Sequence, residues 1–448
     1  MLKKKSDSIS ELGTKKTLTS IILVANAFIW YYVVLHFLED LVTKISPSLS
    51  VSSITIWSLH FSGLIISALV GALTAKKIER NKLLIIWMTL GVISSIALLA
   101  ANTSNVILVS LIGLFLGISL GFGMPTCMNY FSDTVQIENR GRISGITLLA
   151  SGIGIFVFSI ISINSTIILG IILAVWRLSS LLIFLSVRSS IKTESKSNIS
   201  SYKHILSQHA FILYFIPWVM FSLINYLVAP LTSGSGSNIS GTLSIIQTGF
   251  MGIFAVLGGF FMDSFGRKPV AILGFTMLGI GSAALGISTT NIYILYFNSI
   301  IDGVAWGFLL VLFILTIWGD LSYSSTSDKF YAIGASPFFV SLFLYLTVGN
   351  YILNNLSNSA ALFSFGSFFL FLAVLPLVYA SETLPEKATK ERELKGYVEK
   401  ALKQAQKEAG KSQKKDSVKT EKENEKGKEE PEETPEDEEA RKLAEKYY

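Results

Sequence analysis

The sequence is poor in charged residues and has a single cysteine. Only 15% of the 448 residues are charged, compared with about 25% in ordinary soluble domains. One thiol cannot form an internal disulfide, so the redox environment cannot be inferred from pairing. The four histidines lie in separate segments, and the sequence has no H-E-x-x-H pair, cysteine cluster or nucleophile elbow. We therefore expect no metal site, no cofactor and no enzyme activity.

The charges that are present are unevenly distributed. Residues 386–448 hold 17 of the 37 basic and 18 of the 31 acidic residues, whereas the long segment before them is nearly uncharged inside its apolar runs. Neither part has the basic stripe of a nucleic-acid-binding protein. The composition of 386–448 predicts a charged cytoplasmic tail that is disordered or transiently helical, with a docking role as an alternative.

Long apolar runs dominate the rest of the chain. A span of the bilayer needs about 20 mostly apolar residues, and its backbone must satisfy its own hydrogen bonds, so each run predicts a transmembrane helix. The sequence therefore predicts an all-α membrane protein with twelve transmembrane helices. The predicted spans are 17–40, 53–75, 82–101, 104–130, 143–163, 166–187, 207–230, 241–262, 268–288, 291–318, 330–352 and 359–380.

The basic residues of the loops orient these spans. Cytoplasmic loops carry an excess of Lys and Arg, and alternate loops of this chain are basic, whereas among the others only Lys44 is basic. Both termini are then cytoplasmic. The basic residues on the predicted inner side are Lys76, Lys77, Arg80, Lys82, Arg140, Arg142, Arg188, Lys192, Lys196, Lys203, Arg267, Lys268 and Lys329.

A polar connection divides the spans into two groups of six. The segment 189–203 is the longest internal polar stretch, and it lies between the sixth and seventh spans. Two landmarks also repeat at nearly one spacing, because Gly71 to Gly259 is 188 residues and Asp133 to Asp320 is 187. Such repeats predict duplicated halves. The expected organisation is an amino-terminal segment 1–16, a six-helix bundle 17–188, a linker 189–206, a second six-helix bundle 207–385 and the tail 386–448.

The clearest local motif lies between the eighth and ninth spans, where the sequence reads G-x-x-x-D-x-x-G-R-K. Its residues are Gly259, Asp263, Gly266, Arg267 and Lys268. This pattern resembles the signature loop of the major facilitator superfamily, whose members are transporters built from two six-helix halves. Gly259 would permit a close helix contact and Gly266 a tight turn. The resemblance implies that Asp263 and Arg267 form an inner latch.

The corresponding loop of the first half departs from the motif, because Ala75 stands where the family has its aspartate. After the fourth span, Tyr130, Asp133, Arg140 and Gly141 keep the spacing of a motif of the family's sugar-porter branch. This resemblance makes Tyr130, Asp133 and Arg140 candidates for a second network of the inner gate. Other sugar-porter features, including paired glutamines in the span 207–230, are missing.

An aspartate inside the span 291–318 is the strongest candidate for coupling. A charge near the bilayer centre costs about 3 kcal/mol or more and needs a reason. Asp302 lies on one helical face with Asn298 and Trp306, in a span that the resemblance places on the central cavity. Burial favours a protonated carboxylate, which suits a proton-coupling group. A structural carboxylate that is hydrogen-bonded within the bundle is the alternative.

Further polar and aromatic residues are candidates for a substrate cavity. Asn26 and Trp30 share a face of the span 17–40, and Trp218, Ser222 and Asn225 share a face of the span 207–230. Both spans line the cavity if the resemblance holds, as do 104–130 and 291–318. Tryptophan and asparagine can stack on and hydrogen-bond a neutral polar solute, and aromatic packing is the alternative for each tryptophan.

Two further features concern single helices. Near the outer end of the first span, His36 and Glu39 are candidates for an outer gate, and an interfacial polar end is the alternative. Arg177 lies in the middle of the span 166–187. It could bind an anionic substrate, although a structural pair or snorkelling explains it as well.

These observations predict a secondary active transporter that moves a small polar solute, a sugar or another organic metabolite, by alternating access, in symport with protons. We expect it in the lipid bilayer of the plasma membrane, as a monomeric transport unit that binds a small-molecule substrate and no nucleic acid. Two alternatives remain open, which are a receptor of transporter fold that signals through its tail and a lipid-translocating protein.

Overall fold

The structure is a computed structural model, and it describes residues 2–45, 50–75, 77–101, 105–161, 165–188, 200–233, 240–322, 327–355 and 359–384. Within these ranges, side chains are described except at 2–13, 188, 225–233, 350–355 and 359. The predicted tail 386–448 lies outside the described residues, as does most of the predicted linker.

The first half of the chain consists of helices joined by short connections. α1 covers both the first predicted span and the segment before it, because it begins at Leu2. The helices are α1 (Leu2–Ile45), α2 (Val51–Thr74), α3 (Arg80–Ala97), η1 (Leu98–Ala100), α4 (Val106–Gly121), α5 (Met124–Thr134), η2 (Ile137–Asn139), α6 (Arg140–Ile160) and α7 (Thr166–Arg188).

The second half is built in the same way, after the short helix α8, which lies at the end of the predicted linker. The helices are α8 (Tyr202–Ser207), α9 (His209–Ser233), α10 (Ser240–Phe265), α11 (Arg267–Ile287), α12 (Ile292–Leu310), η3 (Val311–Thr316), α13 (Ile317–Leu321), α14 (Asp328–Asn355), α15 (Ser359–Leu372) and α16 (Val374–Tyr379).

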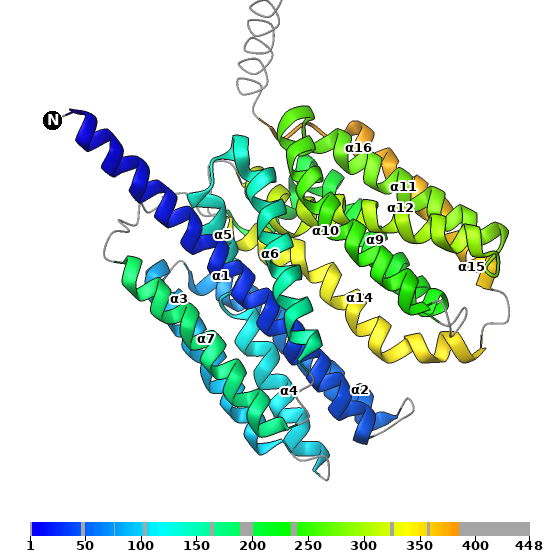
Figure 1. Cartoon of the computed structure of the whole chain (residues 1–448), viewed down its shortest axis with the longest axis horizontal. Coiled ribbons are helices and arrows are strands. Elements are labelled where there is room, and N and C mark those ends of the chain that lie inside the picture. The colour runs from blue at the N-terminus through cyan, green and yellow to red at the C-terminus, as the bar shows by residue number, and fades with distance from the viewer. Residues whose placement is uncertain are drawn as a thin grey trace, which may run out of the picture. The chain divides into compact units, whose positions relative to one another are not determined.

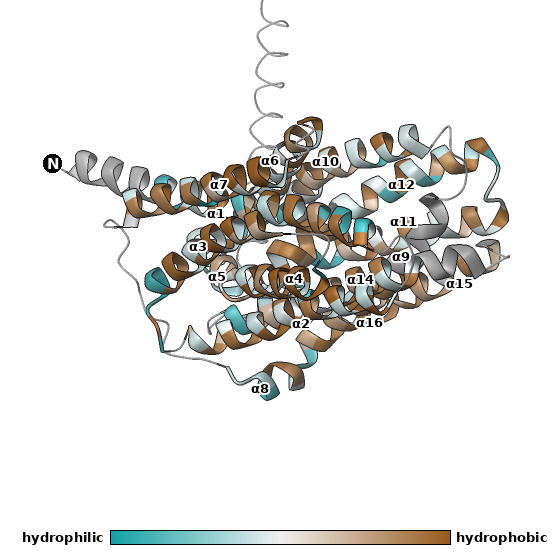
Figure 2. Ribbon diagram, turned by 90° about the horizontal axis from the view of Figure 1, so that it is seen from below, coloured by the Kyte–Doolittle hydropathy of each residue, from teal (hydrophilic) through white to brown (hydrophobic). Residues whose placement is uncertain are grey.

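Helix length and hydropathy confirm the predicted fold class. In the described residues, 11 helical stretches are long and apolar enough to cross a membrane. The remaining predicted span, 207–230, corresponds to α9, of which the shorter stretch His209–Ile224 is described with its side chains and is apolar. Apolar residues cover most of each helix, and polar residues gather near helix ends and in connections (Figure 2). The chain is therefore a multi-pass membrane protein.

Five of the spans in the described residues are made of more than one helical segment, and two of them show how such a break is built. α4 and α5 meet at Gly123, and Pro125 stands in the first turn of α5, where a missing N–H costs nothing. A Cβ at Gly123 would lie 2.1 Å from the ring of Trp87, so a glycine is required at this break. α12, η3 and α13 follow one another directly, and η3 is a six-residue π-helical stretch. π-Helical segments are often found at functional sites.

The two halves repeat the same packing. In the first half α2 packs on α4, α3 on α7 and α1 on α6, and in the second α10 packs on α12, α11 on α15 and α9 on α14. These pairs correspond if each half is read in chain order. Figure 1 shows α1 to α7 together in one bundle and α9 to α16 in another, both within residues 1–385. The predicted duplication is thus visible in the helix contacts.

The halves meet along two seams, α6 against α10 and α2 against α14. The first seam is a close backbone crossing. A Cβ built on Gly259 would lie 2.3 Å from the carbonyl oxygen of Gly141, and a Cβ on Gly141 would lie 2.6 Å from that of Gly259. Since only glycine fits at both positions, the crossing fixes how the start of α6 meets the last turns of α10.

Candidate functional site

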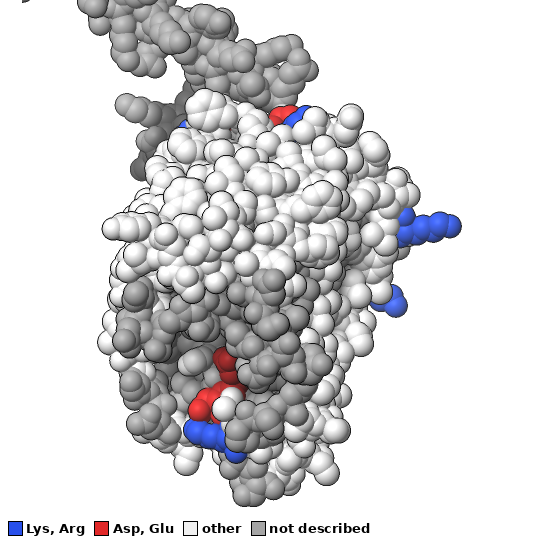
Figure 3. All heavy atoms as spheres, turned by 90° about the vertical axis from the view of Figure 1, so that its right-hand side faces the viewer, with Lys and Arg blue, Asp and Glu red and all other residues white. Residues whose placement is uncertain are grey.

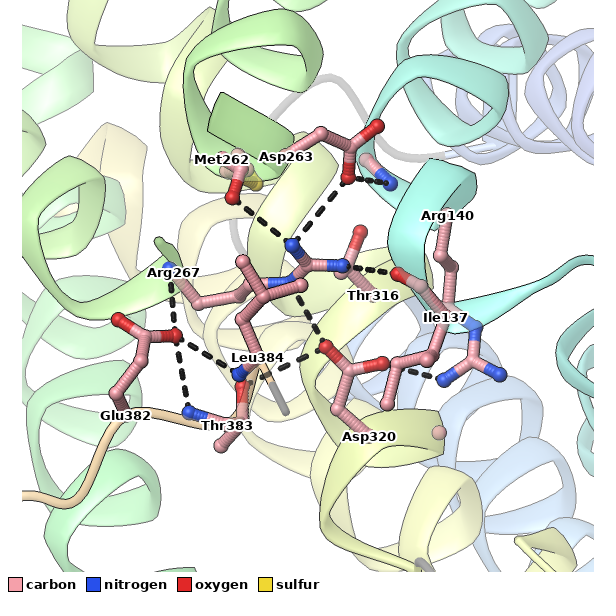
Figure 4. A network of polar contacts seen from close by, with 12 residues as sticks. Ile137, Arg140, Met262, Asp263, Arg267, Thr316, Asp320, Glu382, Thr383 and Leu384 are labelled. Atoms are coloured by element: carbon pink, nitrogen blue, oxygen red, sulfur yellow. Dashed lines mark hydrogen bonds and ion pairs between the residues drawn. The ribbon is translucent and has the colours of Figure 1, made fainter. Parts of the chain in front are cut away.

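A buried carboxylate joins the two halves at their predicted inner side. Asp320 of α13 is 3% exposed and lies between two arginines of different halves. Arg140, at the start of α6, donates from Nη1 to Asp320 Oδ1, and Arg267, at the start of α11, donates from Nε to Oδ2 at 2.9 Å. Figure 4 shows the carboxylate between the guanidinium groups. Charged groups removed from water need such partners on both sides.

The arginines extend this contact to the backbone. Arg267 also donates from Nη2 to the carbonyl of Ile137 in the other half at 2.6 Å and from Nη1 to Met262 at 2.9 Å. Arg140 donates from Nη2 to the carbonyl of Ser132 at 2.6 Å. Asp320, Arg140, Arg267 and Asp263 are called the Asp320 network below.

Asp263 of α10 caps a helix of the opposite half. Its two carboxylate oxygens each accept a backbone N–H at 2.9 Å, from Gly141 and Arg142, in the first turn of α6. These N–H groups have no partner within α6, and the positive end of the helix dipole favours an anion there. Arg267 adds an ion pair at 3.3 Å. Asp263 and Arg267 thus form an ion pair within a larger contact between the halves, and their role as an inner latch stays a prediction.

Glu382 caps α11 in the same manner but within the second half. Its carboxylate accepts the backbone N–H of Arg267 at 2.8 Å and that of Lys268 at 3.1 Å. The chain turns into α11 at Gly266, whose φ of 105° disfavours any other residue. Lys268 donates from Nζ to the carbonyl of Val378 at 2.7 Å, which ties it to α16.

The predicted pair of Asp133 with Arg140 is replaced by other partners. Arg80 of α3 donates to Asp133 Oδ2 at 2.6 Å, within the first half, whereas Arg140 binds Asp320. Tyr130 is fully buried, with the guanidinium of Arg80 5.4 Å from its ring centre. Arg140 thus belongs to the contact of α6 with α13 across the halves, and Asp133 to a contact inside the first half.

A second polar cluster joins the halves at the start of α14. Asn129 of α5 donates to Asp328 Oδ2 at 2.6 Å and accepts from the Ser327 hydroxyl at 2.8 Å. The hydroxyls of Ser132 and Ser327 are 2.9 Å apart. Asp328 is 3% exposed. These residues (Asn129, Ser132, Ser327 and Asp328) are called the Asp328 cluster below.

The end of the linker covers this region from the same side. Lys329 donates from Nζ to the carbonyl of Ser200 at 2.9 Å, and the Tyr202 hydroxyl donates to the carbonyl of Leu69 at 2.6 Å. Burial raises the pKa of Tyr202 to about 12, and the nearby charge of Asp328 adds to the shift, so this hydroxyl keeps its proton. The linker therefore contacts both halves.

A cavity lies between the halves, on the membrane side of these contacts. Its volume is about 100 Å³, and its walls come from α1, α2, α4 and α5 of the first half and from η3 and α14 of the second. Aromatic, aliphatic and thioether side chains dominate the lining, among them Phe28, Met124, Met128, Ile314, Phe338 and Phe339. Tyr31 contributes a hydroxyl that lies 3.3 Å from His60 Nε2.

Asp302 is held inside the second half. It is partly buried in α12, and Gln247 of α10 donates to its Oδ2. No ion pair involving Asp302 is found among the described residues. A carboxylate in a membrane span with a neutral partner can take up a proton without breaking a salt bridge. Its hydrogen-bond partner Gln247 belongs to the same half, and its role in coupling stays a prediction.

The predicted cavity residues of α1 point into the first bundle. Asn26 donates from Nδ2 to the carbonyl of Trp176 at 2.8 Å and accepts from Arg177 Nη1 at 3.2 Å. Trp30 is fully buried and donates from Nε1 to the Ser95 hydroxyl at 2.8 Å. Arg177 stands over the rings of Trp87 and Trp30, with its Cζ 4.4 Å and 5.3 Å from their centres. Neither Asn26 nor Trp30 lines the cavity.

The predicted residues of the second half are also dispersed. Trp218 is fully buried, stacks on Phe313 at 4.8 Å and donates to the carbonyl of Gly334 at 2.8 Å. Ser222 is buried next to it on α9. Trp306 meets the ring of another α9 residue, Phe221, at 4.7 Å, whereas the amide of Asn298 faces Gly281 of α11. The side chain of Asn225 lies outside the described residues.

The predicted outer-gate residues lie near the end of α1. His36 Nδ1 is 3.6 Å from Glu39 Oε2, and both side chains are exposed. One turn further, Lys44 and Asp40 form an ion pair at 2.5 Å. In Figure 3 the described surface is largely uncharged, and acidic side chains lie beside basic ones at a hollow in the lower part of the view and at a second place along its top.

Besides Asp263, two carboxylates join the halves that are not among the candidate residues named from the sequence. Asp320 was noted as a repeat landmark but not as a partner of Arg140 or Arg267, and Asp328 was not considered. A signal was available for both, because each is an aspartate beside a membrane span. The role of each aspartate depends on a distant partner, because Arg140 is 180 residues from Asp320 and Asn129 is 199 residues from Asp328.

The chain is similar to known proteins in its fold but not detectably in its sequence. No protein-family model matches the chain, and no curated protein matches its sequence. Solved structures do match. The MFS proton:xylose symporter XylE, bound to 6-bromo-6-deoxy-D-glucose, aligns with a TM-score of 0.64 and 16% identity over 84% of this chain and 97% of that chain. The human organic anion transporter MFSD10 (TETRAN) aligns with a TM-score of 0.62 and 13% identity over 82% of this chain and 99% of that one.

The chain has the major facilitator fold. Two pseudo-symmetric six-helix bundles and the signature loop between α10 and α11 agree with this assignment. The motif at the junction of α10 and α11 contributes Asp263 and Arg267 to the Asp320 network. At 16% and 13% identity, these likenesses show a shared fold. Substrate and coupling are therefore argued from the chain's own residues.

Proposed function

We propose that this protein is a secondary active transporter that moves a small organic solute across the membrane by alternating access. One observation carries the proposal: the halves are joined at one side by the Asp320 network and the Asp328 cluster, and a cavity lies between them just beyond these contacts. Polar contacts can separate and re-form at modest cost, because water replaces the lost partners when the inner side opens. The two similar solved structures are transporters by name.

Proton symport is the coupling that we propose, with Asp302 as the coupling residue. The carboxylate lies within a membrane-spanning helix, and Gln247 can act as donor to its ionised form. Proton binding and release at this position require no cationic partner to move. Asp328 is the competing candidate, because its contact with Asn129 joins the halves directly.

The test uses purified protein in liposomes that contain a pH-sensitive dye. A screen by thermal stabilisation first supplies solutes that bind the folded state. Each solute is then added outside under an inwardly directed proton gradient, and both dye response and solute uptake are measured. We expect uptake that depends on the gradient and is lost in Asp302→Asn. Unchanged gradient-driven uptake in that variant would exclude Asp302 and direct attention to Asp328→Asn. Binding without any flux would instead favour a receptor.

We further propose that the protein resides in the plasma membrane as a monomeric unit with both termini in the cytoplasm. The basic loops that motivate this orientation include Arg140, Arg142, Arg267 and Lys268, all at the side of the Asp320 network. Protease digestion of sealed cells and of inverted vesicles tests it. Removal of an epitope placed in the segment 386–448 from sealed cells would contradict it.

A further inference from the structure

The cavity between the halves offers an unusual set of groups to a solute. Its lining contains no charged side chain and no side-chain amide. Side-chain polarity comes from three hydroxyl groups, those of Tyr31, Tyr331 and Ser336. A sugar needs a partner for almost every hydroxyl that it removes from water, because each unpaired group costs about 1 to 3 kcal/mol. Such a lining suits a solute with a mainly apolar body.

The hydroxyl protons of all three groups are already used. Tyr331 donates to the carbonyl of Leu315 at 2.6 Å, and Ser336 donates to the carbonyl of Ile333 at 2.7 Å. A carbonyl oxygen can only accept, so in both pairs the proton lies on the hydroxyl and points away from the cavity.

The hydroxyl proton of Tyr31 is also used, in a hydrogen bond to the buried His60. Nδ1 of His60 lies 2.8 Å from the carbonyl of Gly113, so this nitrogen must carry the hydrogen. In a neutral imidazole Nε2 is then an acceptor, and it receives the hydroxyl proton of Tyr31 at 3.3 Å. His60 is fully buried, which favours the neutral ring. It acts as a positioning residue that fixes the direction of the Tyr31 hydroxyl.

From this geometry we infer that the transported solute is a neutral compound with an aromatic or aliphatic body and a hydrogen-bond donor, an O–H or N–H group. The acceptors that we assign to the cavity are the hydroxyl oxygens of Tyr31 and Ser336, because the Tyr331 hydroxyl packs against Gly319. The flexible thioethers of Met124 and Met128 adapt to apolar shapes. This inference rests on the proposed transport function and changes the solute class from the sugar-like one that the sequence suggested.

A labelling experiment tests the solute class without requiring flux. Ala335 lines the cavity on α14, and the single native cysteine, Cys127, is fully buried, so Ala335→Cys introduces one reactive thiol. N-ethylmaleimide labelling of the purified variant is followed by mass spectrometry, with the wild type as background. Ala68→Cys, on the opposite wall, serves if the first variant does not fold.

The probes are 2-phenylethanol, its methyl ether and xylose. The alcohol and the ether share a body and differ in the donor, and xylose has a similar number of non-hydrogen atoms. We expect the alcohol to slow labelling, the ether to need about 3- to 10-fold higher concentration, the value of one hydrogen bond, and xylose to have no effect. Protection by xylose, equal protection by ether and alcohol, or no protection by the alcohol would each overturn the inference.

Matched variants locate the acceptors. Ser336 and Ser341 both lie on α14 and donate to backbone carbonyls at 2.7 Å, but only Ser336 lines the cavity. In the thiol background, Ser336→Ala or Tyr31→Phe should reduce the difference between alcohol and ether, and Ser341→Ala should leave it unchanged. Protection with this pattern but without flux would refute the proposed transport function and support the proposed solute class. Flux of xylose with no protection by the alcohol would support transport and refute the solute class.

Discussion

Removal of one buried charge should open the inner side of the protein. In Asp320→Asn the fold keeps a side chain of the same size, but Arg140 and Arg267 lose the anion that both contact. Breaking a buried ion pair costs about 3 to 5 kcal/mol. We use the lower figure, because the amide can still accept one hydrogen bond and both arginines retain backbone partners.

The cost falls on the closed arrangement alone if the arginines become hydrated when the halves separate. A penalty of about 3 kcal/mol then shifts the closed-to-open ratio by about 100-fold. The assay is labelling of Ala335→Cys by a membrane-impermeant maleimide in inverted vesicles, whose outer surface is the predicted cytoplasmic side. We expect Asp320→Asn to raise the labelling rate by at least 10-fold.

Asp133→Asn is the control, because Asp133 and Arg80 form an ion pair at 2.6 Å inside one half. Its removal should lower stability without changing the labelling rate more than twofold. Equal labelling of the Asp320→Asn variant and its parent, accompanied by a loss of thermal stability, would show that the network only supports the fold. The reasoning on alternating access through this contact would then be refuted.

Three further predictions concern two close helix contacts and one helix cap, and each is measured by thermal unfolding in detergent. Gly259→Ala should lower the free energy of unfolding by about 1 to 3 kcal/mol, because its Cβ would lie 2.3 Å from a backbone oxygen. Gly249→Ala in the same helix is the control and should be neutral or stabilising, because its Cβ would have nothing within 4 Å. Similar losses of stability in both variants would contradict this prediction. Gly91→Ala should clash with Arg177 Nε at 2.3 Å, and Arg177→Met in the same chain should recover at least about 1 kcal/mol in a double-mutant cycle. Glu382→Ala should cost about 1 to 2 kcal/mol through the lost cap of α11, and an unchanged unfolding temperature would exclude that role.

The candidate site could be predicted only in part. The signature loop correctly brought Asp263 and Arg267 to one place, because four residues along a helix and its turn fix their proximity locally. Arg140 was also named, but its pairing with Asp320 was not predicted. Partners from different halves depend on where helix ends meet, which no local pattern encodes.

The predicted cavity residues show the same limit in another form. A helical face groups Asn26 with Trp30, and Asn298 with Trp306, but it does not say which neighbour the face meets. In the structure Asn26 and Trp30 face the interior of their own bundle, where Arg177 needs a hydrogen-bond acceptor and aromatic rings. The apolar lining instead comes largely from residues such as Phe339 and Met128, which the sequence could not distinguish from lipid-facing ones.

The sequence alone determined that this chain crosses the membrane many times, where its helices lie and that it consists of two similar halves. These properties follow from apolar length and repetition along the chain, because a backbone in lipid must bond within its own helix. The tertiary structure decided which carboxylate joins the two halves and which side chains line the cavity. Both depend on contacts between segments far apart in the chain, such as α6 with α13 and α1 with α14, and these exist only once the two bundles have packed together.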